Sequence, residues 1–367
     1  MFNNQNILEY FNQLPTLLKI VWIGSVVLFI LILFFLFYLY YLRTYLRSKE
    51  LISKNLFTQY ENDLITYLYL GENTSQINSE QQTIIDKMKV SIQNTFKRTI
   101  LISVLSKLKS DISGEMALAI NQLFIKTGLL NYALKKLESK KWNQIALGIK
   151  ELTQFEITNV YNEISKFQNY PKQEVRNQVQ LYYVSLFHFK GLEFLDNLKT
   201  PISEWNQIQL LEILQKFDDQ EITDISPWLK SENDSVVLFA LKLAKIYNQF
   251  QVIEILLQLL NHKNKEIRVS AIEILGYFQV KETKEIVKSN FLDRSSEEKI
   301  TFFKILQDIV TADDEAFIIE NTLNPNFQIR FLAFQLLKKN HIEKLHELKQ
   351  NATEFDNSRI FNFLEVV

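Results

Sequence analysis

The chain has 367 residues, of which 47% are hydrophobic, 7 are glycine and 5 are proline. So few glycines and prolines leave little material for the tight turns of a β-sandwich or barrel, and this favours a helical fold. The 41 lysines and arginines nearly balance the 42 aspartates and glutamates, which excludes the broad basic surface of a nucleic-acid-binding protein, and the absence of cysteine excludes disulfides and thiolate metal sites.

An uncharged apolar run at residues 20–42 follows a short N-terminal segment, residues 1–19. As a helix, the run would reach about 34 Å, enough to cross the roughly 30 Å hydrocarbon core of a membrane. Trp22 stands near one end and several tyrosines crowd the other, where amphipathic rings favour the two membrane interfaces. A cleaved signal peptide fits less well, because the run is long and leads into bulky residues instead of a small-residue cleavage site. We therefore predict a single transmembrane helix retained in the lipid bilayer.

The charges that flank this run are unequal. Lys19 is the one basic side chain before the run, whereas four follow it closely: Arg43, Arg47, Lys49 and Lys54. By the positive-inside rule, the N-terminus lies outside and the C-terminal domain lies in the cytoplasm. The expected location is the cytoplasmic (inner) membrane.

Long juxtamembrane helices are expected at residues 43–110. Apolar residues at helical spacing continue from Leu46 to Leu68 and stop before Gly71. The polar stretch 71–80 has the composition of a loop, and a second long helical pattern occupies residues 81–109.

Residues 111–367 are periodic. Seven segments superpose at spacings of 30 to 33 residues on these anchors: Trp142, Val175, Trp205, Val236, Ile267, Glu298 and Ile329. Three places before the anchors, Ser or Asn occurs in five of the seven segments, and these short side chains cap helix N-termini. Four places after them, Ala occurs in four segments and would let a neighbouring helix approach closely. We predict an all-α protein in which stacked helix pairs form an α-solenoid behind the transmembrane helix.

The clearest copy resembles the HEAT-repeat family, particularly its short bacterial form. Residues 265–276 (KEIRVSAIEILG) are similar to that family's helix, which begins with Val-Arg, continues with Ala and ends in Leu-Gly. Weaker copies stand at residues 174–176, 235–240 and 328–333. The resemblance implies a curved scaffold that grips partner proteins.

In that family an Asp precedes the Arg, and a ladder of such pairs ties adjacent repeats together. The resemblance places Asp293 at the Asp position before Glu298, and it places three other residue types in neighbouring repeats: Ser231, His262 and Asn324.

Sequence motifs for catalysis are scarce. The histidines (His188, His262, His341 and His346) show no spacing that brings two imidazoles onto one metal, so solvated or packed side chains are expected. No glycine-rich phosphate loop is present. The acidic pairs Asp218–Asp219 and Asp313–Asp314 are interpreted as solvated turns, and the lysine clusters at 135–141 and 338–339 as solvated faces. We predict no cofactor, no metal site, no small-molecule substrate and no nucleic-acid partner.

One set of basic residues could align along the array. Each member directly follows an anchor of the repeat: Arg176, Arg268, Lys299 and Arg330. These side chains either bond adjacent repeats or present a positive stripe to an acidic partner, and as a stripe they are the predicted partner-binding residues.

The resulting prediction is a non-enzymatic scaffold or accessory subunit that binds a protein partner, with a membrane-resident enzyme or transporter as the favoured class. Two alternatives stay open: a lyase-like enzyme of the HEAT-repeat class, and a cytoplasmic regulator that is merely tethered. A substrate pocket with convergent titratable groups would favour the enzyme.

Overall fold

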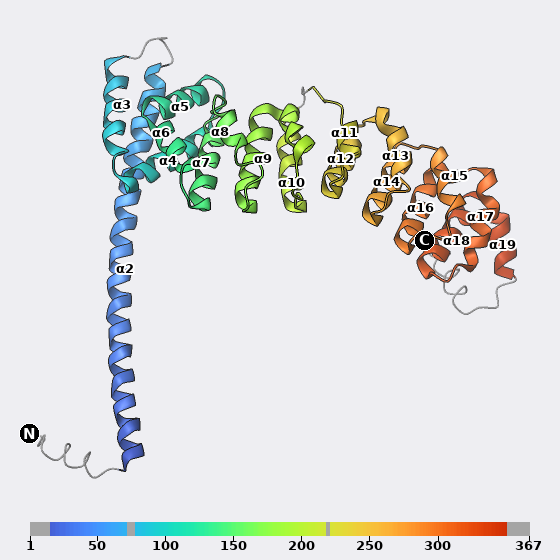
Figure 1. Cartoon of the computed structure of the whole chain (residues 1–367), viewed down its shortest axis with the longest axis horizontal. Helices are drawn as coiled ribbons and strands as arrows, with labels where there is room; N and C mark the ends of the chain where they lie inside the picture. Colours follow the sequence, from blue (N-terminus) through green and yellow to red (C-terminus); the bar gives the residue numbers. More distant parts are fainter. Residues whose placement is uncertain (1–14, 72–77, 218–220, 351–367) are drawn as a thin grey trace, which may run out of the picture. The chain divides into compact units, whose positions relative to one another are not determined.

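The computed structural model describes residues 15–71, 78–217 and 221–350, and within these ranges the chain forms helices and connecting turns without any strand (Figure 1). The all-helical prediction is therefore confirmed for this part of the chain. Two compact units are present, residues 1–134 and residues 135–367. The acidic pair Asp218–Asp219 lies outside the described residues.

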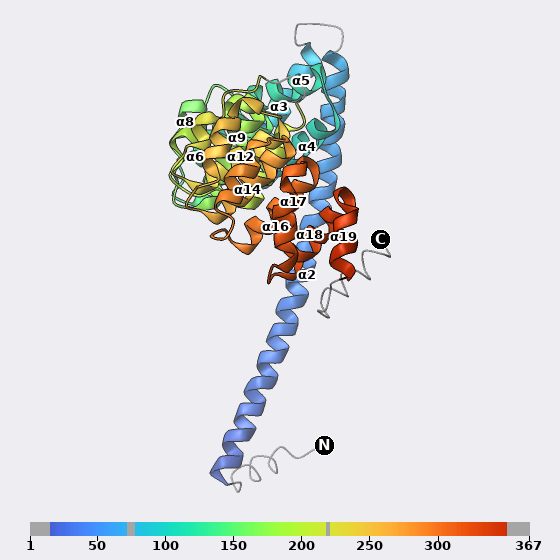
Figure 2. The ribbon, with the colours of Figure 1, turned by 90° about the vertical axis from the view of Figure 1, so that its right-hand side faces the viewer.

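A single helix, α2 (Thr16–Gly71), contains both the apolar run and the predicted helix that follows it. Its stretch from Leu18 to Leu70 is long and apolar enough to cross a membrane, and its most apolar window is not buried by any other part of the protein. Figure 2 shows this blue stretch projecting beyond the other helices of its unit. A signal sequence near the N-terminus would meet the same criteria of length and composition.

The second half of α2 is the core of unit 1. The helices that follow it are α3 (Ser79–Ser91), α4 (Thr95–Asp111), α5 (Glu115–Lys126) and α6 (Leu129–Leu137). Helices α3 and α4 pack on α2, where the side chains of Tyr60, Leu64 and Tyr67 are buried.

The prediction of one helix across residues 81–109 is wrong, because the chain turns between α3 and α4. Asn94 causes the break: its Oδ1 atom accepts hydrogen bonds from the backbone N–H groups of Phe96 at 2.9 Å and Lys97 at 3.2 Å. Asn in this role starts a new helix instead of continuing the previous one.

Unit 2 alternates long helices with short ones. The long helices are α7 (Trp142–Gln154), α9 (Gln173–Phe187), α10 (Glu204–Leu214), α12 (Asp234–Ile246), α14 (Lys265–Tyr277), α16 (Ser296–Ile309) and α18 (Phe327–Asn340). The short elements are α8 (Tyr161–Ser165), η1 (His188–Asn197), α11 (Ser226–Leu229), η2 (Phe250–Val252), α13 (Ile253–Leu259), α15 (Glu282–Ser289), η3 (Ala312–Asp314), α17 (Glu315–Glu320), η4 (Asn321–Leu323) and α19 (Ile342–Gln350).

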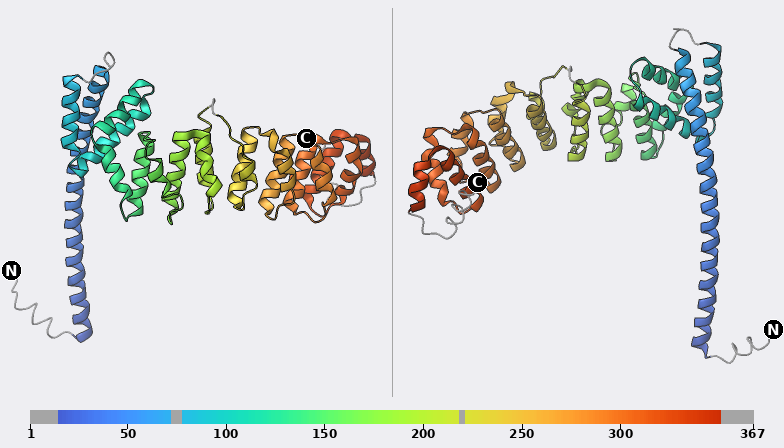
Figure 3. Two further views of the ribbon diagram at one scale, coloured as in Figure 1. Left: turned by 45° about the horizontal axis from the view of Figure 1, so that its top comes forward. Right: turned by 180° about the vertical axis from the view of Figure 1, so that it is seen from behind.

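Each long helix from α7 to α16, except α10, packs on the long helix that follows it. Contacts join α7 to α9, α9 to α10, α12 to α14, α14 to α16 and α16 to α18. Figure 3 shows the long helices of this unit following one another from green to red.

The predicted caps are correct in the second half of unit 2. Side-chain oxygens of Asn233, Asn264, Ser295 and Asn326 accept backbone N–H groups in the first turns of α12, α14, α16 and α18. Each of these residues stands three places before a predicted anchor, which places those anchors in the third helical position.

The predicted register is wrong for two helices. Helix α7 starts after Lys141, not after Ser139, and α10 is capped by Ser203, not by Ile202. The predicted anchors Trp142 and Trp205 are consequently 40% and 68% exposed.

Counting three places from the observed caps gives a corrected series: Gln144, Val175, Asn206, Val236, Ile267, Glu298 and Ile329. The spacings become 31, 31, 30, 31, 31 and 31 residues. Two of these positions carry polar amides, Gln144 and Asn206, whereas the predicted register placed the tryptophans Trp142 and Trp205 there.

The buried side chains follow one pattern across these helices. In α9, α12, α14, α16 and α18 the residues at 0, 4, 5, 7 and 8 places from the corrected anchor are all buried. At 100° per residue these positions span about 160° of the helix circumference, which is wider than one neighbour can cover. Each of these five helices therefore needs a packing partner on both sides.

Gly276 marks the closest approach between two long helices. A Cβ atom built on Gly276 in α14 would lie 2.3 Å from Cγ2 and 2.4 Å from Cβ of Ile305 in α16. We expect Gly276→Ala to destabilise the fold by roughly 1–3 kcal/mol through overpacking, which outweighs the ~1 kcal/mol that Ala gains in helix propensity. Urea unfolding of the full chain in detergent, followed by circular dichroism, measures the loss.

Ile305→Gly provides the control for this prediction, because it removes the Cβ, Cγ2 and Cδ1 atoms of that contact. The cost of Gly276→Ala should shrink in the Ile305→Gly background. An unchanged cost in that background would mean that the contact with Ile305 is not its source.

Candidate partner-binding ridge

The turns before α10, α12, α14, α16 and α18 lie next to one another, and we call them the ridge. They comprise residues 195–203, 227–233, 260–264, 288–295 and 321–326. Hydrogen bonds and shared grooves join consecutive turns, as described below. The ridge is therefore one connected surface built from equivalent places in the 31-residue register.

Two cap residues tie their own turn to the preceding one. The Oδ1 atom of Asn233 caps α12, while its Nδ2 atom donates to the carbonyl oxygens of Leu198 at 3.2 Å and Thr200 at 3.1 Å. Asn264 likewise caps α14 with Oδ1 and donates from Nδ2 to Asp234 at 2.8 Å. An amide can do both because it carries an acceptor and a donor on one planar group. An Asp cap could not make the second bond, because an ionised carboxylate only accepts hydrogen bonds.

The buried carboxylate of Glu298, at the start of α16, accepts hydrogen bonds from two arginines. Arg268 of α14 reaches it with Nε at 2.8 Å and Nη2 at 3.0 Å, and Arg294 donates from Nη1 at 3.1 Å. Arg294 also donates to the carbonyl oxygen of Leu260 at 3.0 Å. Burial opposes ionisation of Glu298, but hydrogen bonds from Arg268 and Ser295 outweigh it and lower the pKa of this carboxyl to about 2.

A second buried carboxylate corrects the prediction for Asp313–Asp314. Asp314 is buried, accepts a hydrogen bond from Lys284 Nζ at 2.9 Å and also pairs with Lys288. Burial opposes its ionisation, but the two lysines and Thr311 outweigh it and lower its pKa to about 2. Asp314 belongs to a buried ion cluster because the lysines of α15 lie opposite, a proximity that the local sequence does not show, whereas Asp313 is exposed as predicted.

The lysine cluster at 135–141 needs a similar correction. Lys136 is paired with Glu151 of α7, with its Nζ atom 2.6 Å from Oε2, and the carboxylate is almost fully buried. Lys135 and Lys140 are exposed, as the solvated-face interpretation requires.

Three of the four predicted partner-binding residues (Arg268, Lys299 and Arg330) bond turns of the ridge, whereas Arg176 bonds the turn before α9, outside the ridge. In Arg176, Arg268 and Arg330, Nη1 donates to the carbonyl oxygen six residues earlier at 2.8 Å and to the one five residues earlier at 3.0 to 3.2 Å. Lys299 donates from Nζ to the carbonyl oxygen of Leu292 at 2.9 Å. All four side chains are half-buried and anchor the turn before their own helix. Partner binding by these residues stays a prediction.

Arg268 also has the alternative role that the sequence offered, since it bonds a neighbouring helix through Glu298. A fifth basic residue with the same geometry, Arg98 in unit 1, was missed. Arg98 stands four places after the cap Asn94, and its Nη1 atom donates to the carbonyl oxygen of Ile92 at 2.8 Å. The signal that could have found it is Asn-x-x-x-Arg, which also describes residues 264–268 and 326–330.

The positions compared with the family's Asp make local bonds. Ser231, His262 and Asn324 each accept the backbone N–H two residues later, at 3.2, 3.1 and 3.0 Å. These bonds shape the turn before each cap and do not reach the next turn. Asp293 is exposed.

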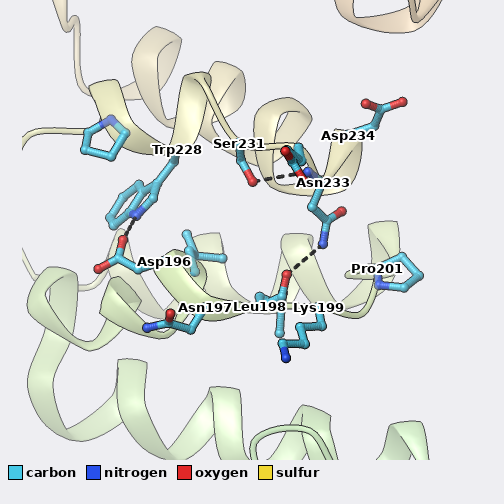
Figure 4. A pocket seen from close by; sticks show the side chains of 12 residues that line it. Asp196, Asn197, Leu198, Lys199, Pro201, Trp228, Ser231, Asn233 and Asp234 are labelled. Carbon is cyan, nitrogen blue, oxygen red and sulfur yellow. Dashed lines mark hydrogen bonds between the residues drawn. The ribbon is translucent and has the colours of Figure 1, made fainter.

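The first of two grooves on the ridge, the Trp228 groove, has a volume of about 920 Å³ and lies between residues 195–201 and residues 227–234. Figure 4 shows Trp228 and Asp196 pointing toward one another, with the indole Nε1 donating to Asp196 at 2.6 Å. Asp196, Glu232 and Asp234 line the groove against a single basic residue, Lys199. This groove is polar and mainly acidic.

The second, the Leu292 groove, has a volume of about 480 Å³ and lies between the turns before α16 and α18. Leu292 and Leu323 line it, are 87% and 75% exposed, and each stands three residues before a cap. Lys299, one of the predicted residues, also lines it and lies over the ring of Phe291. Phe327, exposed in the first turn of α18, extends the apolar surface.

The chain matches no protein-family model and no curated protein. Within the described ranges, no group of three or more His, Asp or Glu side chains is placed to hold a metal ion. The ridge offers two shallow recesses on turns fixed by caps and arginines, an arrangement suited to holding another surface.

Acid should weaken the bonds between turns. Glu298 has an ordinary pKa of 4.5 and a folded-state pKa of about 2, so its stabilising contribution is complete above pH 4.5 and is lost as the pH falls toward 2. We expect the melting temperature of the full chain in detergent to fall across this interval, and Glu298→Gln to have a lower melting temperature at pH 7 with a shallower acid dependence. The exposed Glu266→Gln should keep the wild-type slope. Equal slopes for all three proteins would remove Glu298 from this role.

Proposed function

We propose that this protein is a membrane-anchored, non-enzymatic scaffold or accessory subunit that binds a protein partner through the ridge. The observation that carries the proposal is the pair Leu292 and Leu323. They occupy the same place in the register, 31 residues apart, and both are largely exposed on turns that hydrogen bonds hold in place. Exposed apolar side chains grouped on a rigid surface are typical of protein interaction sites.

A HEAT-like α-solenoid is the proposed architecture of unit 2. The corrected register of about 31 residues and the burial of both faces of its long helices support it. Such an array presents one turn per repeat along one edge. Equivalent turns of successive repeats could in this way form an extended binding surface.

Anchoring by residues 20–42 is the second part of the proposal. Confinement to the membrane raises the effective concentration of the ridge beside other membrane proteins, so a membrane-resident enzyme or transporter is the proposed partner class. The excess of basic residues after the run supports a cytoplasmic location for both units.

The partner-binding part is tested with Leu292→Glu/Leu323→Glu in the full chain. Charged side chains at the centre of an apolar contact should lower partner recovery after detergent extraction about 10-fold or more, equivalent to about 1.4 kcal/mol. Leu118→Glu/Leu147→Glu, which alters two exposed leucines outside the ridge, should recover the same partner as the wild type. Equal recovery with both double variants would argue against the ridge as the interface.

The anchoring part is tested by alkaline carbonate extraction and by protease treatment of intact cells. We expect the chain to remain in the membrane fraction with residues 1–19 attached, and the protease to spare both units. Release of the chain by carbonate would mean that the apolar run is a removed leader, and digestion of the units from outside would reverse the proposed orientation.

A further inference from the structure

The start of α4 lies at the end of unit 1 that is nearer the apolar run. Lys49 of α2 places its Nζ atom 5.3 Å from the ring centre of Tyr45 and 5.5 Å from that of Phe96, in the first turn of α4. Farther along both helices, Lys107 of α4 lies 3.1 Å from Glu61 of α2. Helix α4 therefore runs parallel to α2, with its N-terminus toward the apolar run.

The contact between Lys49 and Phe96 gives the distance of the start of α4 from the end of the apolar run. Lys49 follows Leu42, the last residue of the apolar run, by seven positions, which is about 10 Å along an α-helix. The headgroup region adds about 5–8 Å to each side of the hydrocarbon core. The first turn of α4 thus lies just beyond the headgroups, within reach of an extended lysine side chain.

The charges at this height are mainly positive. Five exposed basic residues belong to this end of unit 1: Arg43, Arg47, Lys49, Lys54 and Lys97. Glu50 is the acidic residue among positions 43–54. Lys97 matters most for the argument, because it comes from α4 and not from the helix that crosses the membrane.

We propose that this end of unit 1 binds anionic phospholipid headgroups, with Lys49 and Lys97 holding α4 against the membrane surface. The inference rests on the proposed anchoring by residues 20–42. Basic residues that lie within a Debye length of an anionic leaflet, about 8–10 Å at physiological salt, are attracted to it. Two helices fixed to one surface would hold unit 1 in a defined orientation, which a single spanning helix cannot do.

The chain has no cysteine, so a single fluorophore can be attached through Thr95→Cys, an exposed position next to Phe96. The full-length labelled protein is reconstituted into vesicles of phosphatidylcholine alone or mixed with phosphatidylglycerol, each carrying a nitroxide quencher on a headgroup. We expect stronger quenching in the phosphatidylglycerol vesicles, and less of it at high salt.

Two matched double variants decide the question. Lys49→Gln/Lys97→Gln should reduce quenching in anionic vesicles to the level seen in neutral ones. Lys87→Gln/Lys107→Gln removes the same charge from α3 and α4, but beside Asp63 and Glu61, which are about 30 Å beyond Leu42. This control should quench like the wild type.

Quenching that is equal in both kinds of vesicle, or that falls equally in both double variants, would overturn the proposal. Unchanged melting temperatures show that the variants remain folded. Carbonate extraction of the same vesicles separates the two inferences: a chain that is released lacks the anchor, whereas a chain that stays without lipid-dependent quenching lacks only the headgroup contact.

Discussion

Burial of two faces on five of the long helices (α9, α12, α14, α16 and α18) is the constraint on which unit 2 depends. In α14 the side chains of Ile267, Ala271, Ile272, Ile274 and Leu275 are all buried, and no single neighbour could cover them. A helix pair by itself would leave an apolar face in water, so it becomes stable only when another pair packs beside it. Close approach is part of the same requirement, which is why Ala271 and Gly276 stand where larger side chains would force α14 and α16 apart. The chain therefore repeats its pattern instead of forming one closed core.

Apolar contact sets the distance between helices, but it does not fix how they slide past one another. The hydrogen bonds and ion pairs at the ridge fix the position of one helix along its neighbour. The two guanidinium groups on Glu298 have directional donors, and a buried carboxylate that loses one of them cannot be solvated by water, so a shifted register carries a large penalty. The amides of Asn233 and Asn264 work in the same way at lower strength. The residues that define the geometry of the ridge are thus the polar ones, while the most exposed side chains of the Leu292 groove are the apolar Leu292 and Leu323.

The helical class, the long apolar helix and four of the helix caps could be predicted because each depends on local pattern. The predicted register is wrong at Trp142 and Trp205 because the corrected anchor positions hold amides: Gln144, which is half-buried, and Asn206, which is buried. Asn206 is buried because it bonds Gln180 across the contact between α9 and α10. Asp314 was misread for a related reason: its lysine partners are 26 and 30 residues away in sequence, and only the packing of α15 brings them near. The basic residues after the anchors were predicted to bond adjacent repeats or to bind a partner; their bonds to carbonyl oxygens of their own turns depend on the fold of those turns, which the sequence pattern does not show.

The uninterrupted course of α2 makes it a stiff rod. Its 56 residues correspond to about 84 Å without a proline or an internal loop between the apolar run and the core of unit 1. A hinge would let the apolar segment and the packed segment reorient independently, and no such element exists between Thr16 and Gly71. Under the proposed anchoring, tilting of the apolar part when bilayer thickness changes would be transmitted through this rod to the helices packed on its far end. Unit 1 would then be the head of a lever whose other arm lies in lipid.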